Sequence, residues 1–253
     1  MSTIAILSAL LDEQRGLLEQ LSNPQKIKRA GRTFWCGEWC GHDVVLALTK
    51  IGKVAAATTT TCLMEAFGVK CVLFTGVAGG IGSGVKVGDV VVANAFIQHD
   101  MDSSPLFARY QIPLYDCATL ACDVALTALL LEAASAGLTG VGDHFHHENL
   151  LGKPDIHTGL IASGDRFVSS AQDAAGVLTG LQSAGFEPLA VEMEGAAVAQ
   201  VCRDYGVPFA AVRTISDRAD DAAHVDFSAF VQQVASPYAL AMVSEFIKML
   251  PKT

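Results

Sequence analysis

Residues 191–197 read Val-Glu-Met-Glu-Gly-Ala-Ala and lie at a predicted junction between a strand and a helix. The apolar run before them, Pro188–Val191, is typical of a buried strand. After them, apolar residues recur from Val198 to Tyr205 at positions i, i+3, i+4 and i+7, which is the spacing of one helical face. Ligands bind to open α/β sheets at the edge where strands end and helices begin. The junction is therefore a predicted binding site.

The two glutamates of this junction, Glu192 and Glu194, have two interpretations. Acidic residues stabilise the N-terminus of a helix, where the partial charge is positive. A carboxylate at the end of a strand can also accept hydrogen bonds from the vicinal hydroxyls of a sugar. Met193 lies between them, and its polarizable side chain can pack against a sugar ring. The second interpretation requires that other parts of the chain contribute to the same site.

The rest of the chain alternates predicted strands with predicted helices. Most strands are continuous and apolar, which is typical of a mostly parallel sheet covered by helices on both faces. No linker or repeat divides the 253 residues, so we expect one α/β domain over residues 1–253, with three layers and a mixed sheet. The predicted strands are Thr3–Ala9, Thr33–Glu38, Asp43–Thr49, Cys71–Thr75, Gly88–Ala95, Thr158–Ala162, Pro188–Val191 and Phe209–Ile215, and the predicted helices include Val54–Phe67, Leu120–Ala136 and Ala171–Leu181.

Two further segments have less regular patterns. A helix is predicted from Asp12 to Leu21, and Asn23-Pro24 would end it. A glycine loop, Gly76–Gly84, is predicted after the strand Cys71–Thr75. The loop matches neither a dinucleotide-binding motif nor a P-loop, so it could hold a ligand or mark a close crossing of two backbones.

The composition is that of a globular protein, with 51% hydrophobic and 17% charged residues. The formal net charge of −9 argues against nucleic acid or an anionic membrane as a partner. No apolar run is long enough to span a membrane, and Ile4–Leu11 lacks the basic flank of a signal peptide. The seven cysteines form no zinc pattern, so we expect most of them to be buried thiols in a reducing cytoplasm.

Polar groups follow four predicted strands at one edge of the sheet. They are Glu13, the glycine loop, Glu192 with Glu194, and Asp217. A single acid after a strand is usually a turn residue or a helix cap. Several acids at one edge are harder to explain in that way, because burying unpaired carboxylates together is costly.

Six motifs make the chain resemble the 5′-methylthioadenosine/S-adenosylhomocysteine nucleosidases of the purine nucleoside phosphorylase superfamily. They follow the order found in that family and extend over nearly the whole chain. The motifs are Ile51–Ala56 (IGKVAA), Thr75–Gly80 (TGVAGG), Val87–Val92 (VGDVVV), Ser163–Asp165 (SGD), Val191–Glu194 (VEME) and Arg213–Asp217 (RTISD).

The resemblance implies hydrolysis of the N-glycosidic bond between adenine and a 5′-thio-substituted ribose, with water as co-substrate and no cofactor or metal. Asp217 matches the acid that delivers a proton to adenine N7, and it must carry that proton in order to act. Glu13 matches the carboxylate that takes a proton from the attacking water. Positioned acids and bases of this kind typically contribute ~10²–10⁴-fold each.

The resemblance also implies a set of substrate-binding residues. Glu194 matches the acceptor for the ribose hydroxyls, and Met193 matches a side chain that packs on the sugar. Phe167 matches a ring that stacks on adenine, and the backbone of Val168 matches the group that contacts the adenine edge. The remaining positions implied by the motifs are Ile51, Gly79, Ser216 and Arg213, and Arg213 is equally consistent with an ion pair to one of the acids.

Two features depart from the family pattern. Val77 stands where the family usually has a serine whose hydroxyl helps hold the water or, in phosphorylases, phosphate. Its apolar side chain disfavours a phosphorylase. The loop Asp100–Pro113 differs in sequence, although in the family it reaches the neighbouring subunit's pocket. A homodimer is therefore expected, with Leu106, Phe107 and Pro113 as an apolar lining.

Several alternatives stay open. The chain could be another purine nucleoside hydrolase of the futalosine type, a purine nucleoside phosphorylase, or a nucleoside-binding protein without turnover. The presence of both Glu13 and Asp217 argues against the binding protein, because binding alone needs no base to activate water. An internal cluster, His144–Glu148, has a spacing that a metal site could use, but a polar exposed loop is the favoured interpretation.

Overall fold

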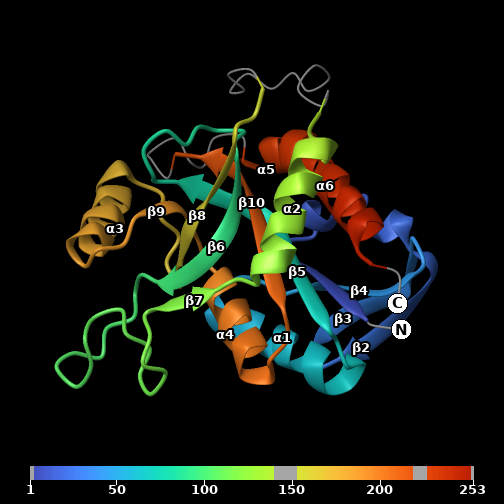
Figure 1. Cartoon of the computed structure of the whole chain (residues 1–253), viewed down its shortest axis with the longest axis horizontal. Coiled ribbons are helices and arrows are strands. Elements are labelled where there is room, and N and C mark those ends of the chain that lie inside the picture. The colour runs from blue at the N-terminus through green and yellow to red at the C-terminus, as the bar shows by residue number, and fades with distance from the viewer. Residues whose placement is uncertain (1–2, 140–152, 219–226, 252–253) are drawn as a thin grey trace.

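The computed structural model describes residues 3–139, 153–218 and 227–251, which fold around one ten-stranded mixed sheet. The sheet has the order β10-β6-β8-β9-β5-β1-β4-β3-β2, with β7 beside β6, and β10 also pairs with β5. Because of that additional pairing, β5, β9, β8, β6 and β10 form a closed ring from which β1 to β4 extend (Figure 1). The strands are β1 (Ile4–Ser8), β2 (Ser22–Arg29), β3 (Arg32–Trp39), β4 (His42–Leu48), β5 (Cys71–Gly80), β6 (Val90–Gln98), β7 (Thr119–Ala121), β8 (Ile156–Ser163), β9 (Pro188–Glu192) and β10 (Phe209–Asp217).

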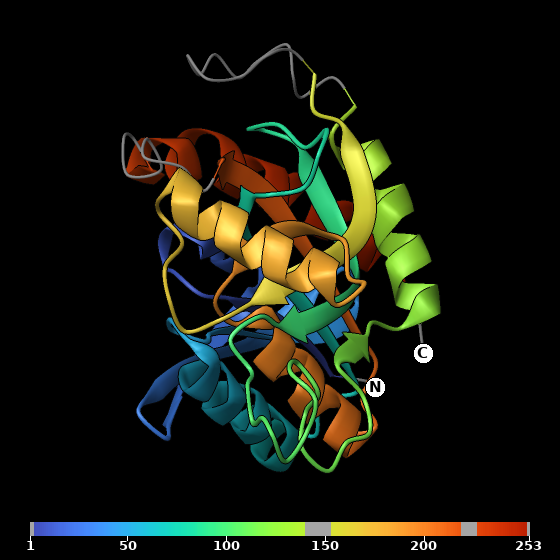
Figure 2. The same ribbon diagram turned by 90° about the vertical axis from the view of Figure 1, so that its left-hand side faces the viewer.

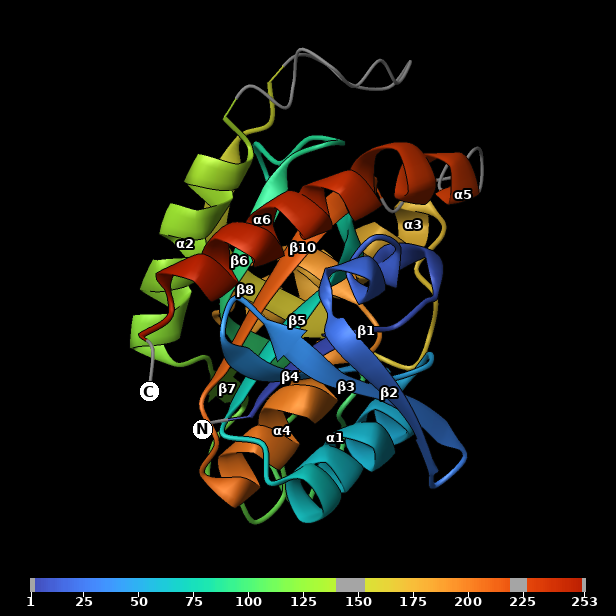
Figure 3. The same cartoon turned by 90° about the vertical axis from the view of Figure 1, so that its right-hand side faces the viewer.

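Helices cover both faces of this sheet (Figure 3). The helices α1 (Lys53–Phe67) and α4 (Gly195–Tyr205) pack together on one face, and α2 (Val124–Gly137) and α6 (Ser236–Met249) pack together on the other. Successive residues of a strand point to opposite faces. Ala5 and Leu7 of β1 accordingly join the first core, while Ile4 and Ile6 join the second. The prediction of an α/β fold with a mixed sheet and helices on both faces is confirmed.

A third, smaller core lies beneath α3 (Ala171–Ser183), which crosses the outside of the strand ring (Figure 2). Leu181 of α3 packs there with Ala162 of β8 and Val191 of β9. The C-terminal region contains α5 (Phe227–Phe230) and a π-helical segment, Val231–Ala235, before α6 begins. These elements bring the end of the chain back to the segment that follows β1.

The helix predicted from Asp12 to Leu21 is wrong. The structure has two short 3₁₀ helices instead, η1 (Asp12–Gln14) and η2 (Leu18–Gln20). Gly16 between them has φ +83°, which an α-helix does not allow. The side chain of Glu13 also turns back and accepts hydrogen bonds from the amides of Ala9 and Leu10. These bonds hold the backbone in a turn instead of a continuous helix.

Strand β2 has no counterpart among the predicted strands. All eight of its residues are exposed and it lies at the edge of the sheet, so its sequence lacks the alternation of apolar and polar residues that marks a half-buried strand. By contrast, the predicted strands Thr33–Glu38 and Asp43–Thr49 are present as β3 and β4. They form a hairpin whose turn residues, Cys40 and Gly41, both have positive φ, as a tight two-residue turn requires.

The predicted glycine loop is also largely a strand, because β5 continues through Gly80. Close approach explains these glycines better than turning does. A Cβ on Gly76 would lie 2.9 Å from a carboxylate oxygen of Glu13, and one on Gly80 would lie 3.0 Å from Ile215. A close crossing of chain segments therefore accounts for Gly76 and Gly80.

Other features concern expectations about the chain as a whole. All seven cysteines are free thiols, but only Cys122 and Cys202 are buried, so the expectation that most of them are buried is wrong. None of the helices in the described ranges has the length and apolar character needed to cross a membrane.

The predicted helix Leu120–Ala136 begins later, at Val124, where the Asp123 side chain caps it by accepting from the Leu126 amide at 2.9 Å. The cluster His144–Glu148 lies outside the described residues.

Candidate active site

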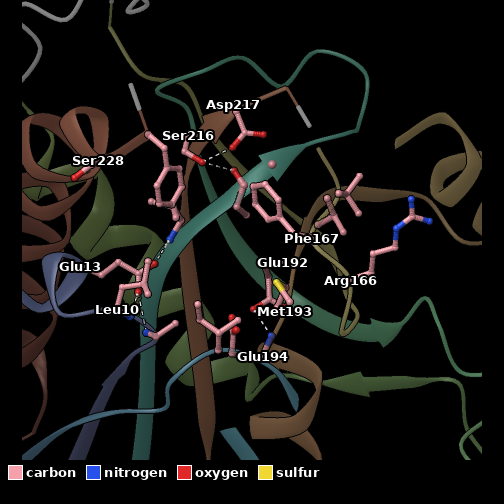
Figure 4. Close-up of a pocket in the computed structure, with 18 residues that line it drawn as sticks. Leu10, Glu13, Arg166, Phe167, Glu192, Met193, Glu194, Ser216, Asp217 and Ser228 are labelled. Atoms are coloured by element: carbon pink, nitrogen blue, oxygen red, sulfur yellow. Dashed lines mark hydrogen bonds between the residues drawn. The ribbon is translucent and has the colours of Figure 1, made fainter. Parts of the chain in front are cut away.

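A cavity of about 480 Å³ opens where β1, β5, β9 and β10 end, and most of the predicted site residues line it (Figure 4). These segments are far apart in sequence and meet because the strand ring brings their ends to one place. Phe167 and Val168 reach the cavity from the segment between β8 and α3. The predicted residues that line it are Glu13, Ile51, Gly79, Phe167, Val168, Met193, Glu194, Ser216 and Asp217.

Glu13 is a buried carboxylate with a fixed orientation. It is only 4% exposed. The amides of Ala9 and Leu10 donate to its Oε2 at 2.7 and 2.8 Å, and the amide of Val77 donates to its Oε1 at 3.1 Å. Burial raises the pKa of Glu13 above its ordinary value, although these amides and the charge of Arg213 act in the opposite direction.

Asp217 lies on a different wall of the same cavity, at the end of β10. Its side chain is half-buried. The hydroxyl of Ser216 donates to Asp217 Oδ2 at 2.6 Å, and the backbone of Asp217 pairs with that of Gly79 in β5. This carboxyl group can therefore be reached from the cavity while a neighbouring hydroxyl orients it.

Glu194 is another buried acid of the lining, at 6% exposure, and Glu192 beside it is 7% exposed. It stands at the N-cap position of α4, but its side chain makes no capping hydrogen bond. Instead, Oε1 accepts from the amide of Gly52 at 2.8 Å. Burial, followed by the negative charge of Glu192, raises the pKa of Glu194 to about 8.

Glu192, by contrast, is bonded to the N-terminus of α4. Its carboxylate accepts from the amides of Glu194 and Gly195 at the start of α4, as the first interpretation of the Glu-Met-Glu sequence predicts. The Ser163 hydroxyl also donates to it. The guanidinium of Arg213 pairs with Glu192 Oε2 at 2.8 Å and lies over the ring of Phe74, with 3.9 Å from Cζ to the ring centroid.

Arg213 was expected among the substrate-binding residues, but it is 1% exposed and does not belong to the cavity lining. The ion pair, its alternative interpretation, is what the structure contains. The physical reason is the register of β10, which turns the arginine toward the interior while Ser216 and Asp217, at the end of the strand, reach the cavity.

The rest of the lining is mainly apolar. Val168 is buried, Met193 is half-buried, and Phe167 is 46% exposed. Ile51 and Val77 complete this apolar surface near the acids. A flat aromatic base and the apolar edge of a sugar would both find apolar contacts here.

Several lining residues were not predicted from sequence. Ala9 and Leu10 carry the amides that donate to Glu13. Their position shortly before Glu13 in the chain is the only sequence signal that connects them with the site. Arg166 precedes Phe167 and also borders the cavity. Phe227 and Ser228 come from the C-terminal α5, and no pattern in the sequence connects them with the distant acids.

No cluster of three or more potential metal ligands occurs within residues 3–139, 153–218 and 227–251. The chemistry that this lining can perform is proton transfer and hydrogen bonding. It offers one carboxylate fixed by amides, one carboxyl group beside a hydroxyl, and a third acid that is free to accept from hydroxyls on the side away from Gly52.

Comparison with known proteins gives one family model and two relatives that each match more than nine tenths of the chain. Residues 3–248 match the family model described as the phosphorylase superfamily. The chain is 34% identical over 246 residues to the aminodeoxyfutalosine nucleosidase of Helicobacter pylori. That alignment covers 96% of this chain and 98% of the relative. It is 37% identical over 234 residues to the 5′-methylthioadenosine/S-adenosylhomocysteine nucleosidase of Bacillus thuringiensis, covering 92% and 93% of the two chains.

A solved structure agrees with these relatives. The 5′-methylthioadenosine/S-adenosylhomocysteine nucleosidase of Neisseria meningitidis, in complex with methylthio-immucillin-A, superposes with a TM-score of 0.84. The two sequences are 36% identical, and the match covers 99% of this chain and 100% of the other. The similarity therefore extends over the whole fold, including every segment that lines the cavity.

Proposed function

The chain belongs to the phosphorylase superfamily, and from this premise we propose that it hydrolyses the N-glycosidic bond of 5′-methylthioadenosine, S-adenosylhomocysteine or both. Water is the co-substrate, and the products are adenine and the 5′-thio-substituted ribose, which can enter purine and methionine salvage. One observation carries the proposal: Glu13, Glu194 and Asp217, from three distant parts of the sequence, line one cavity of about 480 Å³. That volume lies within the usual range of small-molecule sites, ~300–1,000 Å³.

Glu13 is the proposed base. A carboxylate offers about four lone-pair positions, and three of those on Glu13 accept backbone amides. The remaining position on Oε1 can accept a hydrogen bond from the attacking water and then its proton. The raised pKa suits this role, because it makes the ionised carboxylate a stronger base than an ordinary glutamate.

Asp217 is the proposed acid. Its protonated carboxyl group transfers a proton to N7 of adenine, so that the base departs as a neutral molecule while the C–N bond breaks. The hydroxyl of Ser216 holds Asp217 Oδ2 and thereby fixes the direction in which the carboxyl group faces. Phe167 stacks on the purine in this proposal, while the Val168 backbone and Gly79 border it.

Glu194 is the proposed acceptor for the ribose hydroxyls. The Gly52 amide orients one of its oxygens, and Met193 beside it packs against the sugar. Positive charge develops on the ribose as the bond to adenine lengthens. That charge favours the ionised form of Glu194, whose pKa burial otherwise raises, and the carboxylate in turn stabilises the charge. Arg213 supports this part of the site from behind, through Glu192.

Two enzyme alternatives can be separated from this proposal. The first alternative is a related hydrolase that acts on a nucleoside with a different 5′ substituent, and the similarity to the aminodeoxyfutalosine nucleosidase is its support. A phosphorylase is disfavoured, because the apolar Val77 borders the cavity next to Glu13 and adds no donor for phosphate.

The test is release of adenine from 5′-methylthioadenosine in phosphate-free buffer, measured beside S-adenosylhomocysteine and aminodeoxyfutalosine. The proposal expects release without phosphate, with kcat/KM for a thio-substituted substrate above that for aminodeoxyfutalosine. Release that depends on added phosphate would indicate a phosphorylase. Adenine binding with no turnover of any of the three would indicate a binding protein.

We further propose a cytoplasmic homodimer. The apolar side chains of Leu106 and Leu114 are 83% and 87% exposed in one loop, and Val54 and the cavity residue Ile51 are also exposed. Exposed apolar surface often marks a protein contact. Sedimentation equilibrium should give twice the monomer mass, and Leu106→Ser with Leu114→Ser should shift the equilibrium toward monomer. Seven free thiols are consistent with a reducing compartment.

A further inference from the structure

Lys53 lies beside the cavity without lining it, and its half-buried side chain is the centre of a polar cluster, called the hub below, with Gln98, Asp100 and Asp165. Its side chain is 15% exposed. The ammonium group contacts Asp100 Oδ1 at 2.6 Å, Gln98 Oε1 at 3.0 Å and Asp165 Oδ2 at 4.0 Å. One cation at the start of α1 therefore joins the end of β6 to the segment that follows β8.

Backbone hydrogen bonds tighten the same three segments. Asp165 Oδ1 accepts from the Lys53 amide at 2.7 Å, and the Asp165 amide donates to Asp100 Oδ2 at 2.9 Å. The His99 amide donates to the carbonyl of Ser163 at 3.0 Å. A Cβ on Gly164 would lie 2.2 Å from the ring of His99, so the segment after β8 packs directly on the end of β6.

Two walls of the cavity meet at this hub. Asp165 is followed by Arg166, Phe167 and Val168, which form the wall proposed to contact the purine. On the other side, the residue before Lys53 is Gly52, whose amide holds Glu194 Oε1 at 2.8 Å. Gly52 has φ +94°, and a Cβ there would lie 3.1 Å from Asp165 Oδ1. The purine wall and the ribose acceptor are thus fixed relative to each other through Gly52, Lys53 and Asp165.

The balance of charge shows what Lys53 contributes. Burial acts to raise the pKa of Asp100, but the hydrogen bonds from Lys53 and the Asp165 amide, with the charge of Lys53, hold it below its ordinary value. Without the ammonium group, the carboxylates of Asp100 and Asp165 would face each other with no cation between them. Repulsion would then separate the segments that carry the two walls.

We propose that Lys53 is a positioning residue, which holds the segment Asp165–Val168 and the Gly52–Glu194 contact in the geometry that binds the nucleoside. This inference rests on the proposed function, because it takes these two walls as the binding surfaces for base and sugar. It gives a role to Lys53, Asp100 and Asp165, which neither act as acid or base nor contact the substrate in the proposed function.

The first test compares Lys53→Met with Lys53→Arg and with the control Lys50→Met, which removes the same charge from an exposed side chain three residues away. For Lys53→Met we expect KM for 5′-methylthioadenosine and the dissociation constant of adenine to rise roughly tenfold, as loss of a charge-assisted hydrogen bond predicts. The reduction in kcat should be smaller, about twofold to threefold, because Glu13 and Asp217 keep their partners. Lys53→Arg should recover most of the affinity, and Lys50→Met should behave like wild type.

Other patterns would overturn the proposal. Values of KM and adenine affinity within twofold of wild type in Lys53→Met would show that the hub does not position the binding walls. A loss of kcat with unchanged KM would show a role in the chemical step instead. If Lys53→Met does not fold, Asp100→Asn provides the same comparison from the other partner, with a rise in KM of about threefold expected.

A second measurement separates this inference from the proposed function. Amide hydrogen exchange in the ligand-free protein should become faster at Lys53 and Asp165 in Lys53→Met than in wild type, because both amides donate within the hub. Unchanged exchange would refute the hub even in an active enzyme. If the wild type releases no adenine but exchange is faster in Lys53→Met than in the wild type, only the proposed function is refuted.

Discussion

Glu13 and Asp217 line the same cavity, but the fold holds them in different ways. Glu13 is buried and fixed by three backbone amides from two segments of the chain. Asp217 is half-buried at the end of a strand, and the side chain of its neighbour Ser216 donates to it. Only a substitution by proline removes a backbone amide donor, whereas a serine hydroxyl can rotate and is deleted by alanine.

The difference teaches how two carboxyl groups in one site can take opposite roles. Three amide donors favour an ionised carboxylate that accepts protons, although burial works against the charge. A carboxyl group near solvent, oriented by one hydroxyl, can exchange its proton between catalytic cycles. If this comparison is correct, substitutions at the two positions should differ in size and in the step that they affect.

The largest effect is expected from Glu13→Gln. The glutamine keeps the size of the side chain but cannot take a proton from water, and its amino group would face a backbone amide donor. We expect kcat to fall by about 10³-fold or more, while the dissociation constant of adenine stays within about twofold, since Glu13 lies away from the proposed purine wall. Glu19→Gln is the control, because Glu19 is exposed on the adjacent 3₁₀ turn. Near-normal kcat in Glu13→Gln would remove the base from the proposal.

Asp217→Asn should reduce kcat less, by about 10²-fold, because solvent near a half-buried position can deliver some of the missing proton. The comparison becomes sharper with a second substrate, a 5-methylthioriboside whose 4-nitrophenolate leaving group needs no protonation. Asp217→Asn should cleave that substrate at nearly the wild-type rate, whereas Glu13→Gln should not. Equal losses for both substrates in Asp217→Asn would contradict its role as the acid.

Ser216→Ala tests whether the hydroxyl orients Asp217. Removal of one hydrogen bond to a carboxyl group should reduce kcat by roughly fivefold to tenfold and leave KM almost unchanged. Stopped-flow or steady-state assays with 5′-methylthioadenosine will measure the change. A rise in KM without a loss of kcat would instead place Ser216 in substrate binding.

The smallest effect concerns Glu194, the second buried acid, and its contribution to stability. Its folded pKa of about 8 lies above the ordinary value of 4.5, so the folded state binds the proton more tightly than the unfolded state. The resulting stabilisation is complete below about pH 4.5 and is lost as the pH rises through about 8. We expect Tm of the wild type to fall between about pH 5 and pH 8 by roughly 5 °C more than Tm of Glu194→Gln. Parallel curves for the two proteins would show that Glu194 ionises normally in the fold.

Much of the fold could be predicted because local patterns report burial. The buried strands of the sheet center and the helices α1, α3 and α4 follow from apolar runs and helical spacing. The exposed edge strand β2 could not be predicted in this way, because nothing on it is buried. The turns around Glu13 could not either, since that backbone is shaped by a side chain folding back on amides four and three residues earlier.

The sequence by itself determined the order of the motifs, the acids at the strand ends and the apolar character of the strands, since these depend on residue type and spacing alone. Only the tertiary structure decided that Glu192 rather than Glu194 bonds the start of α4, that Arg213 points into the interior, and that β5 continues through its glycines. It also decided that Lys53 joins three separate segments. The physical reason is that each of these facts is a contact between residues distant in the chain, and such contacts are fixed by strand register and packing rather than by local periodicity.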